Sequence, residues 1–92
     1  MEETAKQQRM EFLYRLLAGI QTPEDMEALL EDLCTRKEVE NMAERVFAAK
    51  LLLENNTYAQ VMEQCSISSA TLSRVSRCVQ YGSGYRRALT GE

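Results

Sequence analysis

The segment SISSATLSRVSRCVQYG, residues 66–82, contains side chains that could contact DNA. Its apolar residues recur at helical spacing on one face. The opposite face carries small and basic side chains: Ser69, Ala70, Ser73, Arg74 and Arg77. In a major groove, alanine can contact a thymine methyl group, serine can hydrogen-bond base edges, and arginine can bind guanine or phosphate. A helix face that meets only solvent can have the same composition, so the neighbouring elements must decide between the two interpretations.

The residues before this segment predict a second, shorter helix and a tight turn. In TYAQVMEQCSIS, Thr57 and Gln60 can form a capping box, and Ser68 can cap the helix that follows. Two short helices joined by a turn have the spacing of a helix-turn-helix. The apolar positions expected to hold its helices together are Val61, Cys65, Ile67, Leu72 and Val75.

A helix-turn-helix presents the start of its second helix to the major groove and uses flanking residues to bind the DNA backbone. We therefore predict base contacts from the N-terminal half of the second helix. The candidate groove residues are Ser68, Ser69, Ala70, Ser73 and Arg74, and the candidate phosphate contacts are Thr57, Tyr58 and Arg77.

Composition favours a small globular protein and argues against an enzyme. The chain of 92 residues supports one domain, with 45% hydrophobic and 27% charged residues. It has no histidine, no phosphate-binding loop and no cluster of metal ligands, so we expect no catalytic residue, no metal and no cofactor. No segment is typical of a bilayer span or a secretion signal, and the three dispersed cysteines suit a reducing compartment. We expect a cytoplasmic protein without a membrane partner.

The net charge of −3 is unevenly distributed along the chain. Residues 1–56 contain seven Lys or Arg and twelve Asp or Glu, whereas residues 57–92 contain four and two. The field of DNA phosphates acts over roughly 10 Å, so the charge of the contacting surface matters more than that of the whole chain. A basic C-terminal part on an acidic scaffold is therefore compatible with double-stranded DNA as a partner.

Capping residues and apolar periodicity predict helices throughout and no strand. The expected helices cover residues 4–19, 23–33, 36–54, 58–65, 69–81 and 85–89. The first and third have apolar residues on more than one face, and a chain this short has too few other elements to cover both. We therefore expect a homodimer in which helices of two subunits pack together; the alternative is a compact monomeric bundle.

The run TYAQVMEQCSISSATLSRVSRCVQYGSGY resembles the C-terminal half of the Trp repressor superfamily. SRVSRC followed by YG is especially similar to the bacterial YerC/YecD-type branch of TrpR-related proteins. With LCTRKEVENMAERVFAAKLL upstream, the resemblance spans about Met26 to Tyr85. It implies an all-α, Trp-repressor-like intertwined helical homodimer with a helix-turn-helix. Within a single domain, residues 1–92, we expect dimerisation helices over 1–55, the helix-turn-helix over 56–80 and a C-terminal segment over 81–92.

The resemblance also implies an effector pocket between the third helix and the recognition helix, where the Trp repressor binds tryptophan. By position, Arg45 and Arg74 match the two arginines beside that ligand. Val75 replaces a glycine and Cys78 replaces a serine. The added volume of a β-branched side chain where the indole would lie costs about 1–3 kcal/mol. We expect that tryptophan is not the corepressor; either another small molecule binds or none does. A surface ion pair is the alternative role for Arg45.

These observations predict a transcription regulator, most simply a repressor, that binds double-stranded DNA as a homodimer. The alternative is a helical protein-interaction module that kept the fold but lost DNA reading. The acidic balance is consistent with that alternative. Met62 and Ser66 depart from the usual helix-turn-helix pattern, which often has a small residue and a glycine at these positions.

Overall fold

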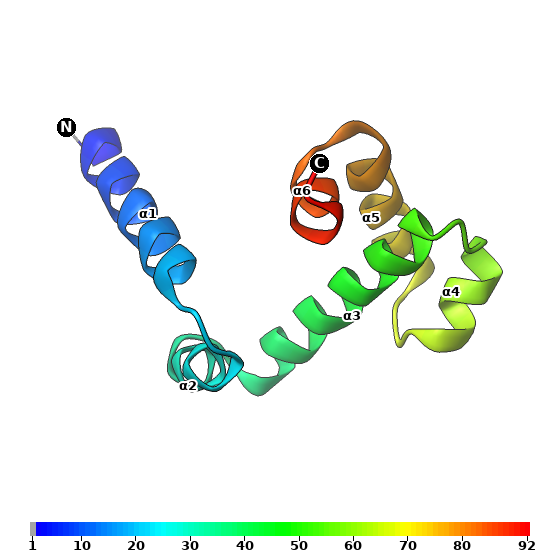
Figure 1. Cartoon of the computed structure of the whole chain (residues 1–92), viewed down its shortest axis with the longest axis horizontal. Coiled ribbons are helices and arrows are strands. Elements are labelled where there is room, and N and C mark those ends of the chain that lie inside the picture. The colour runs from blue at the N-terminus through cyan, green and yellow to red at the C-terminus, as the bar shows by residue number, and fades with distance from the viewer. Residues whose placement is uncertain (1) are drawn as a thin grey trace. The chain divides into compact units, whose positions relative to one another are not determined.

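The computed structural model describes residues 2–92, and within that range all regular structure is helical (Figure 1). The six helices are α1 (Glu2–Gly19), α2 (Pro23–Leu33), α3 (Arg36–Leu53), α4 (Tyr58–Gln64), α5 (Ser69–Tyr81) and α6 (Gly84–Thr90). The all-helical prediction is confirmed, with boundaries close to those expected. In this part of the chain, no helix has the length and apolarity needed to cross a membrane. The chain divides into two compact units, one ending at Thr35 and one from Arg36 to Glu92.

The N-terminal unit consists of α1 and α2, and its connection is capped as the sequence predicts. The hydroxyl oxygen of Thr22 accepts a hydrogen bond from the amide N–H of Asp25 at 3.1 Å. Pro23 occupies the first turn. Backbone N–H groups there have no acceptor within the helix, so the missing N–H of proline costs no hydrogen bond. Glu24 and Asp25 add negative charge at the positive end of the helix dipole.

This unit has no core of its own: none of residues 4–35 is buried. Large apolar side chains of α1 are among its most exposed, with Phe12 72% and Met10 52% accessible. Full burial of such a side chain stabilises a folded protein by about 1.5–3 kcal/mol. Because these side chains of α1 are largely exposed, they contribute little of that stabilisation here.

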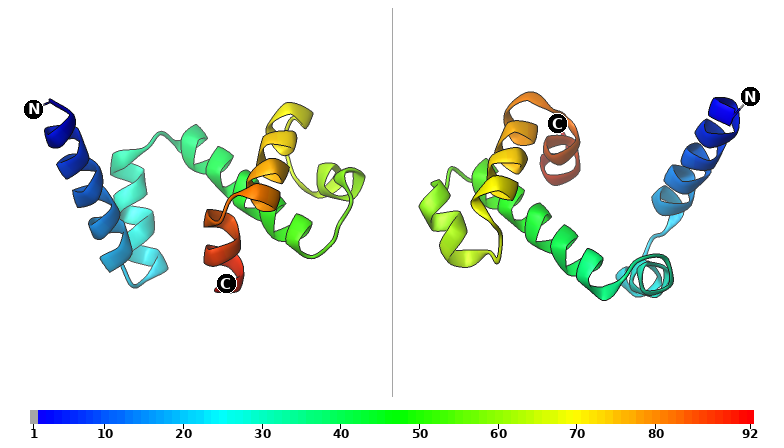
Figure 2. Two further views of the ribbon diagram at one scale, coloured as in Figure 1. Left: turned by 90° about the horizontal axis from the view of Figure 1, so that it is seen from above. Right: turned by 180° about the vertical axis from the view of Figure 1, so that it is seen from behind.

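The C-terminal unit contains the core. Helix α5 packs on α3, α6 packs on both, and α4 packs on α3 (Figures 1 and 2). The buried residues of the core are Ala48, Ala49, Leu51, Val61, Cys65, Leu72, Val75 and Val79. Five residues were predicted to hold the helix-turn-helix together. Four of them, Val61, Cys65, Leu72 and Val75, belong to this core, and the fifth, Ile67, packs against it. The motif is therefore locked onto α3 as well as onto itself.

Helix α3 buries only part of its apolar surface. Ala48 and Ala49 are fully buried, whereas Val46 and Phe47 remain 46% and 45% exposed. Part of the apolar excess of this helix, which the sequence predicts, thus remains exposed within the C-terminal unit.

Local capping explains where α3 ends and α4 begins. Asn55 has a φ of 69°, in the left-handed region that asparagine tolerates. Asn56 donates from Nδ2 to the carbonyl oxygen of Leu51 at 3.0 Å. The predicted capping box is present: the amide of Gln60 donates to the Thr57 hydroxyl at 3.2 Å, and the amide of Thr57 donates to Gln60 Oε1 at 2.8 Å.

Helix α5 begins and ends at the residues predicted to bound it. The amide of Thr71 donates to the Ser68 hydroxyl oxygen at 3.2 Å. At the other end, a Cβ on Gly82 would lie 2.8 Å from the carbonyl oxygen of Cys78. Because real Cβ atoms do not approach a backbone oxygen so closely, this position requires glycine for the chain to leave the helix and enter α6.

Candidate nucleic-acid interface and adjoining cavity

The two faces of α5 differ as the sequence predicts. Leu72, Val75 and Val79 are buried in the core. The opposite face is exposed and consists of Ser69, Ala70, Ser73, Arg74 and Arg77. Because the core fixes one face, the helix presents short side chains and two guanidinium groups to the outside in a defined orientation. Such a face can approach a base edge closely and still reach phosphate.

The remaining candidate contacts lie at the N-termini of the two short helices. Thr57, Tyr58 and Ser68 are all exposed, with Tyr58 47% accessible. The Ser68 hydroxyl accepts from the Thr71 amide and donates to the Thr71 hydroxyl oxygen at 3.0 Å. Its first role is therefore to cap α5, and a DNA group would have to bind its remaining lone pair or replace the bond to Thr71.

A carboxylate of α3 holds the turn of the helix-turn-helix. Glu44 Oε1 accepts a hydrogen bond from the amide of Ser66 at 2.8 Å. The two residues are 22 positions apart, so no local pattern could have predicted the bond. Burial raises the pKa of the adjacent Cys65 thiol, and the negative charge of Glu44 adds to the rise. Cys65 is thus held as an uncharged core thiol.

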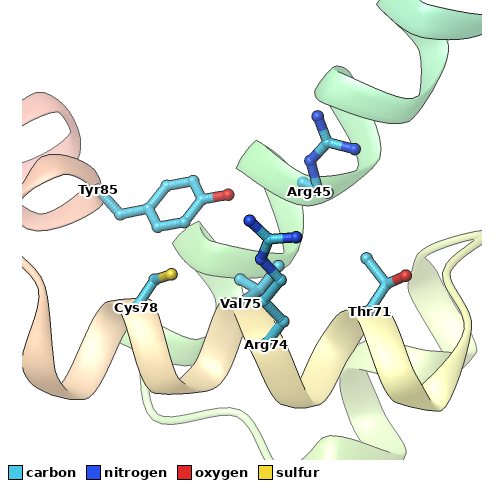
Figure 3. A pocket seen from close by; sticks show the side chains of 6 residues that line it. All are labelled: Arg45, Thr71, Arg74, Val75, Cys78 and Tyr85. Atoms are coloured by element: carbon cyan, nitrogen blue, oxygen red, sulfur yellow. The ribbon is translucent and has the colours of Figure 1, made fainter.

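Beside the exposed face of α5, a cavity of about 340 Å³ lies between α3, α5 and α6 (Figure 3). Its lining residues are Arg45, Thr71, Arg74, Val75, Cys78 and Tyr85. The structure therefore brings together all four residues predicted for the effector pocket. Val75 is 2% exposed and lies at the base of the cavity, which α5 forms (Figure 3).

Sequence reasoning missed two lining residues. Thr71 could have been found, because residues 71, 74, 75 and 78 follow the spacing of one helix face. Tyr85 comes from α6, and its ring extends over the cavity with the hydroxyl directed toward the arginines (Figure 3). Its position depends on how α6 packs, for which the sequence contains no spacing signal.

The arginines of the cavity have no acidic partner among the described residues. Ion pairs join Glu11 to Arg15 at 3.9 Å, Arg36 to Glu40 at 3.4 Å and Lys50 to Glu54 at 2.9 Å, and none of these includes Arg45 or Arg74. The surface ion pair considered for Arg45 is therefore not seen among the side chains of residues 4–92. In the same range, no three His, Cys, Asp or Glu side chains gather as metal ligands would.

The chain matches the Trp repressor protein family over residues 8–91. It is 36% identical over 78 residues to the protein YerC of Bacillus subtilis (strain 168), covering 84% of this chain and 75% of YerC. A crystal structure of a candidate Trp repressor from Staphylococcus aureus superposes with a TM-score of 0.83 at 29% identity, covering 88% of this chain and 82% of the other. A TrpR-like protein from Eubacterium eligens gives 0.83 at 34% identity, covering 88% and 84%.

The chain belongs to the Trp repressor family and has its all-α fold. The resemblance identified from the sequence is thereby confirmed. Members of this family are non-enzymatic DNA-binding proteins, which agrees with the expectation that the chain is not an enzyme.

Proposed function

We propose that the chain is a sequence-specific transcription regulator that binds double-stranded DNA as a homodimer, with α4 and α5 as its helix-turn-helix. The repressor role is part of the proposal, because a dimer seated on an operator obstructs other proteins there. The observation that carries it is the division of α5 into a locked apolar face and an exposed face of serine, alanine and arginine. Family membership supports the same function.

The contact residues of this proposal are those expected from the sequence. Ser68, Ser69, Ala70, Ser73 and Arg74 read the major groove, and Thr57, Tyr58 and Arg77 bind the backbone. All eight are exposed, as such contacts require. Two-fold related recognition helices read half-sites one helical turn apart, about 34–36 Å, so the operator is an inverted repeat.

The homodimer is supported by the apolar side chains that the chain leaves uncovered. Phe12 of α1 and Phe47 of α3 are exposed, and residues 4–35 include no buried side chain. In the proposed assembly, residues 1–55 form the dimerisation helices, residues 56–80 the helix-turn-helix and residues 81–92 a C-terminal segment. Two intertwined subunits would bury the apolar surface that one subunit cannot.

Selection of bound fragments from random DNA by the purified full-length protein tests the proposal. We expect enrichment of one sequence with two-fold symmetry, and affinity that falls steeply as salt increases because bound phosphates release counterions. A helical protein-interaction module would enrich no sequence and would show no salt-dependent retention on DNA.

Two substitutions on α5 then connect binding to the proposed face. Ser73→Ala and Arg74→Gln should each weaken operator binding while circular dichroism shows an unchanged helical fold. Gln80→Ala is the matched control, because Gln80 is an exposed polar residue near the other end of the same helix. If Gln80→Ala weakens binding as much as Ser73→Ala, the proposed face is not the one that reads DNA.

We further propose that tryptophan is not the effector of this regulator. The Val75 side chain stands at the base of the cavity where family resemblance places the indole. Isothermal titration of the protein with tryptophan should give no saturable heat. Tight saturable binding would overturn this part of the proposal.

A further inference from the structure

The carboxyl end of α5 is bonded to α6 through one side chain. Arg86 of α6 donates a hydrogen bond from Nη2 to the carbonyl oxygen of Val79 at 3.0 Å, and the bond is partly buried. Carbonyl oxygens in the last turn of a helix have no amide donor within that helix, so a side chain from another element can satisfy one of them. Arg86 therefore caps α5 from outside the helix.

The same side chain supplies a charge that α5 lacks at this end. The last turn of α5 contains no basic residue. A helix carries partial negative charge at its carboxyl end, and a nearby cation stabilises it. Because the donor is charged, its bond to the carbonyl oxygen is stronger than a bond from a neutral group.

Helix α6 has few other attachments to the core. It has seven residues, none of them buried, and Ser83 at its N-terminus makes no side-chain capping bond. Tyr85 and Leu89, one turn apart, are only partly buried against the core. So short a helix is marginal in water without packing. We therefore expect Arg86 to contribute a large share of the attachment between α6, which lies beside α5 and α3 (Figure 2), and the end of α5.

The other half of α5 carries the residues proposed to contact base edges. Ala70 and Val79 are nine residues apart, which corresponds to about 13–14 Å along the helix axis. A tilt of α5 by about 10° displaces these two positions relative to each other by about 2 Å. Hydrogen bonds to base edges tolerate a change of only about 0.5 Å. The attachment of the carboxyl end thus bears on contacts made near the amino end.

We propose that Arg86 is a positioning residue for DNA recognition, which fixes the carboxyl end of α5 against α6 and thereby sets the orientation of the groove-facing residues. This inference rests on the proposed function. Arg86 acts through α5 and does not itself contact DNA. A direct contact between Arg86 and a DNA phosphate is the alternative that the experiments must separate from this role.

The first experiment measures amide hydrogen exchange in the full-length protein without DNA. Arg86→Met removes the donor and the charge but keeps a long apolar side chain. Exchange of the α6 amides and of the last turn of α5 should become at least about tenfold faster, because local opening no longer breaks a charge-assisted bond. Arg86→Lys retains a charged donor and should restore part of the protection.

Arg87→Met is the matched control. It removes the same charge from the next residue of α6, which is exposed, and leaves the bond from Arg86 to Val79 in place. Its exchange rates should equal those of the unmodified protein. If Arg86→Met exchanges no faster than Arg87→Met, the bond does not hold the end of α5 and the proposal is overturned.

The second experiment compares the selected operator with unrelated DNA at several salt concentrations, with circular dichroism confirming that every variant is folded. Arg86→Met should weaken operator binding at least about tenfold and binding to unrelated DNA much less, because misplaced base contacts affect only the specific complex. The salt dependence should match that of Arg87→Met. A merely structural loss of folded protein would lower both affinities by the same factor and leave their ratio unchanged.

Three results would overturn the positioning role. One is an unchanged ratio between operator and unrelated DNA in Arg86→Met. Another is an equal loss on both DNAs with a salt slope shallower by about 1 than in Arg87→Met, which would identify a phosphate contact. In both cases the unmodified protein still binds its operator, so the proposed function stands. If the unmodified protein selects no operator, the proposed function itself fails, and the positioning role fails with it.

Discussion

At the scale of single residues, the exposed side chains of α5 divide into two kinds. Ser69, Ala70 and Ser73 are short and can act only at close range, whereas Arg74 and Arg77 are long and charged. Contacts to base edges discriminate between sequences, whereas contacts to phosphates strengthen binding to every sequence. Substitutions of the first kind should therefore change the preference between DNA sequences, whereas substitutions of phosphate-binding residues should change the affinity for all sequences.

Arg77→Gln should weaken binding to the operator and to unrelated DNA by similar factors. Its proposed partner is a phosphate, so the slope of log affinity against log salt should become shallower by about 1. Fluorescence anisotropy at several salt concentrations measures both effects. Arg36→Gln is the control, since Arg36 is paired with Glu40 in the first turns of α3. A variant that loses affinity for the operator alone would contradict a phosphate contact.

Residue types and spacing were enough to predict several of these features. Thr22, Thr57, Ser68 and Gly82 act within one turn of a helix, and the structure has each in its predicted capping role. Tyr85 was not predicted as a cavity residue, because its position follows from the packing of α6 on α3 and α5. Local chemistry is visible in a sequence, whereas contacts between distant helices are not.

At the scale of elements, the turn between α4 and α5 is attached to α3 by one side-chain hydrogen bond. Glu44 accepts from the amide of Ser66, which otherwise would have only solvent as a partner. The bond connects α3 to the turn that precedes α5 and helps to set the orientation of α5. It is therefore expected to affect how the recognition helix is presented as well as how stable the unit is.

Glu44→Ala should lower the free energy of unfolding by about 1–2 kcal/mol, because a charged acceptor is lost. It should also weaken operator binding, whereas Glu44→Gln retains an acceptor and should restore much of both. Urea denaturation and anisotropy measure the two quantities.

The control for this prediction is Glu40→Ala, one turn earlier on the same helix. Its exposed ion pair with Arg36 is worth about 0–1 kcal/mol, so little change is expected in either measurement. If Glu44→Ala were as silent as Glu40→Ala, the bond to the turn would have no measurable role.

At the scale of the whole molecule, the uncovered apolar surface is the dominant feature. The core of residues 36–92 is well buried, but α1 and one face of α3 carry exposed aromatic side chains. Monomeric soluble proteins rarely leave large contiguous apolar patches in water. The exposed apolar side chains of each unit are the reason for proposing a homodimer.

Light scattering coupled to gel filtration should give the mass of two chains for the purified protein. Phe12→Asp places a charge in the proposed subunit interface and should shift the mass toward one chain, because burying an unpaired carboxylate is unfavourable. Gln7→Asp adds the same charge at a position of α1 that is already polar and should leave the dimer intact. A single-chain mass for the unmodified protein would reject the assembly.

The sequence predicted the unbalanced apolar surface but not which residues remain outside the core. The excess on α3 follows from composition and helical period, yet whether Phe47 or Ala48 faces inward depends on where α5 and α6 dock. In the proposed homodimer, the partner of that surface lies on a second chain. A single sequence can therefore predict that a second copy covers this surface without specifying how the two copies would pack together.

Ala48 and Ala49 share the core with Leu72 and Val75, and both are wholly enclosed. The methyl groups of these two alanines therefore set the spacing between α3 and α5, the helix proposed to read DNA. Replacement of either alanine by a larger aliphatic residue would tilt α5 while its exposed side chains stayed the same. Under the proposed function, operator preference would then change through substitutions in the core, while every proposed groove residue stays the same.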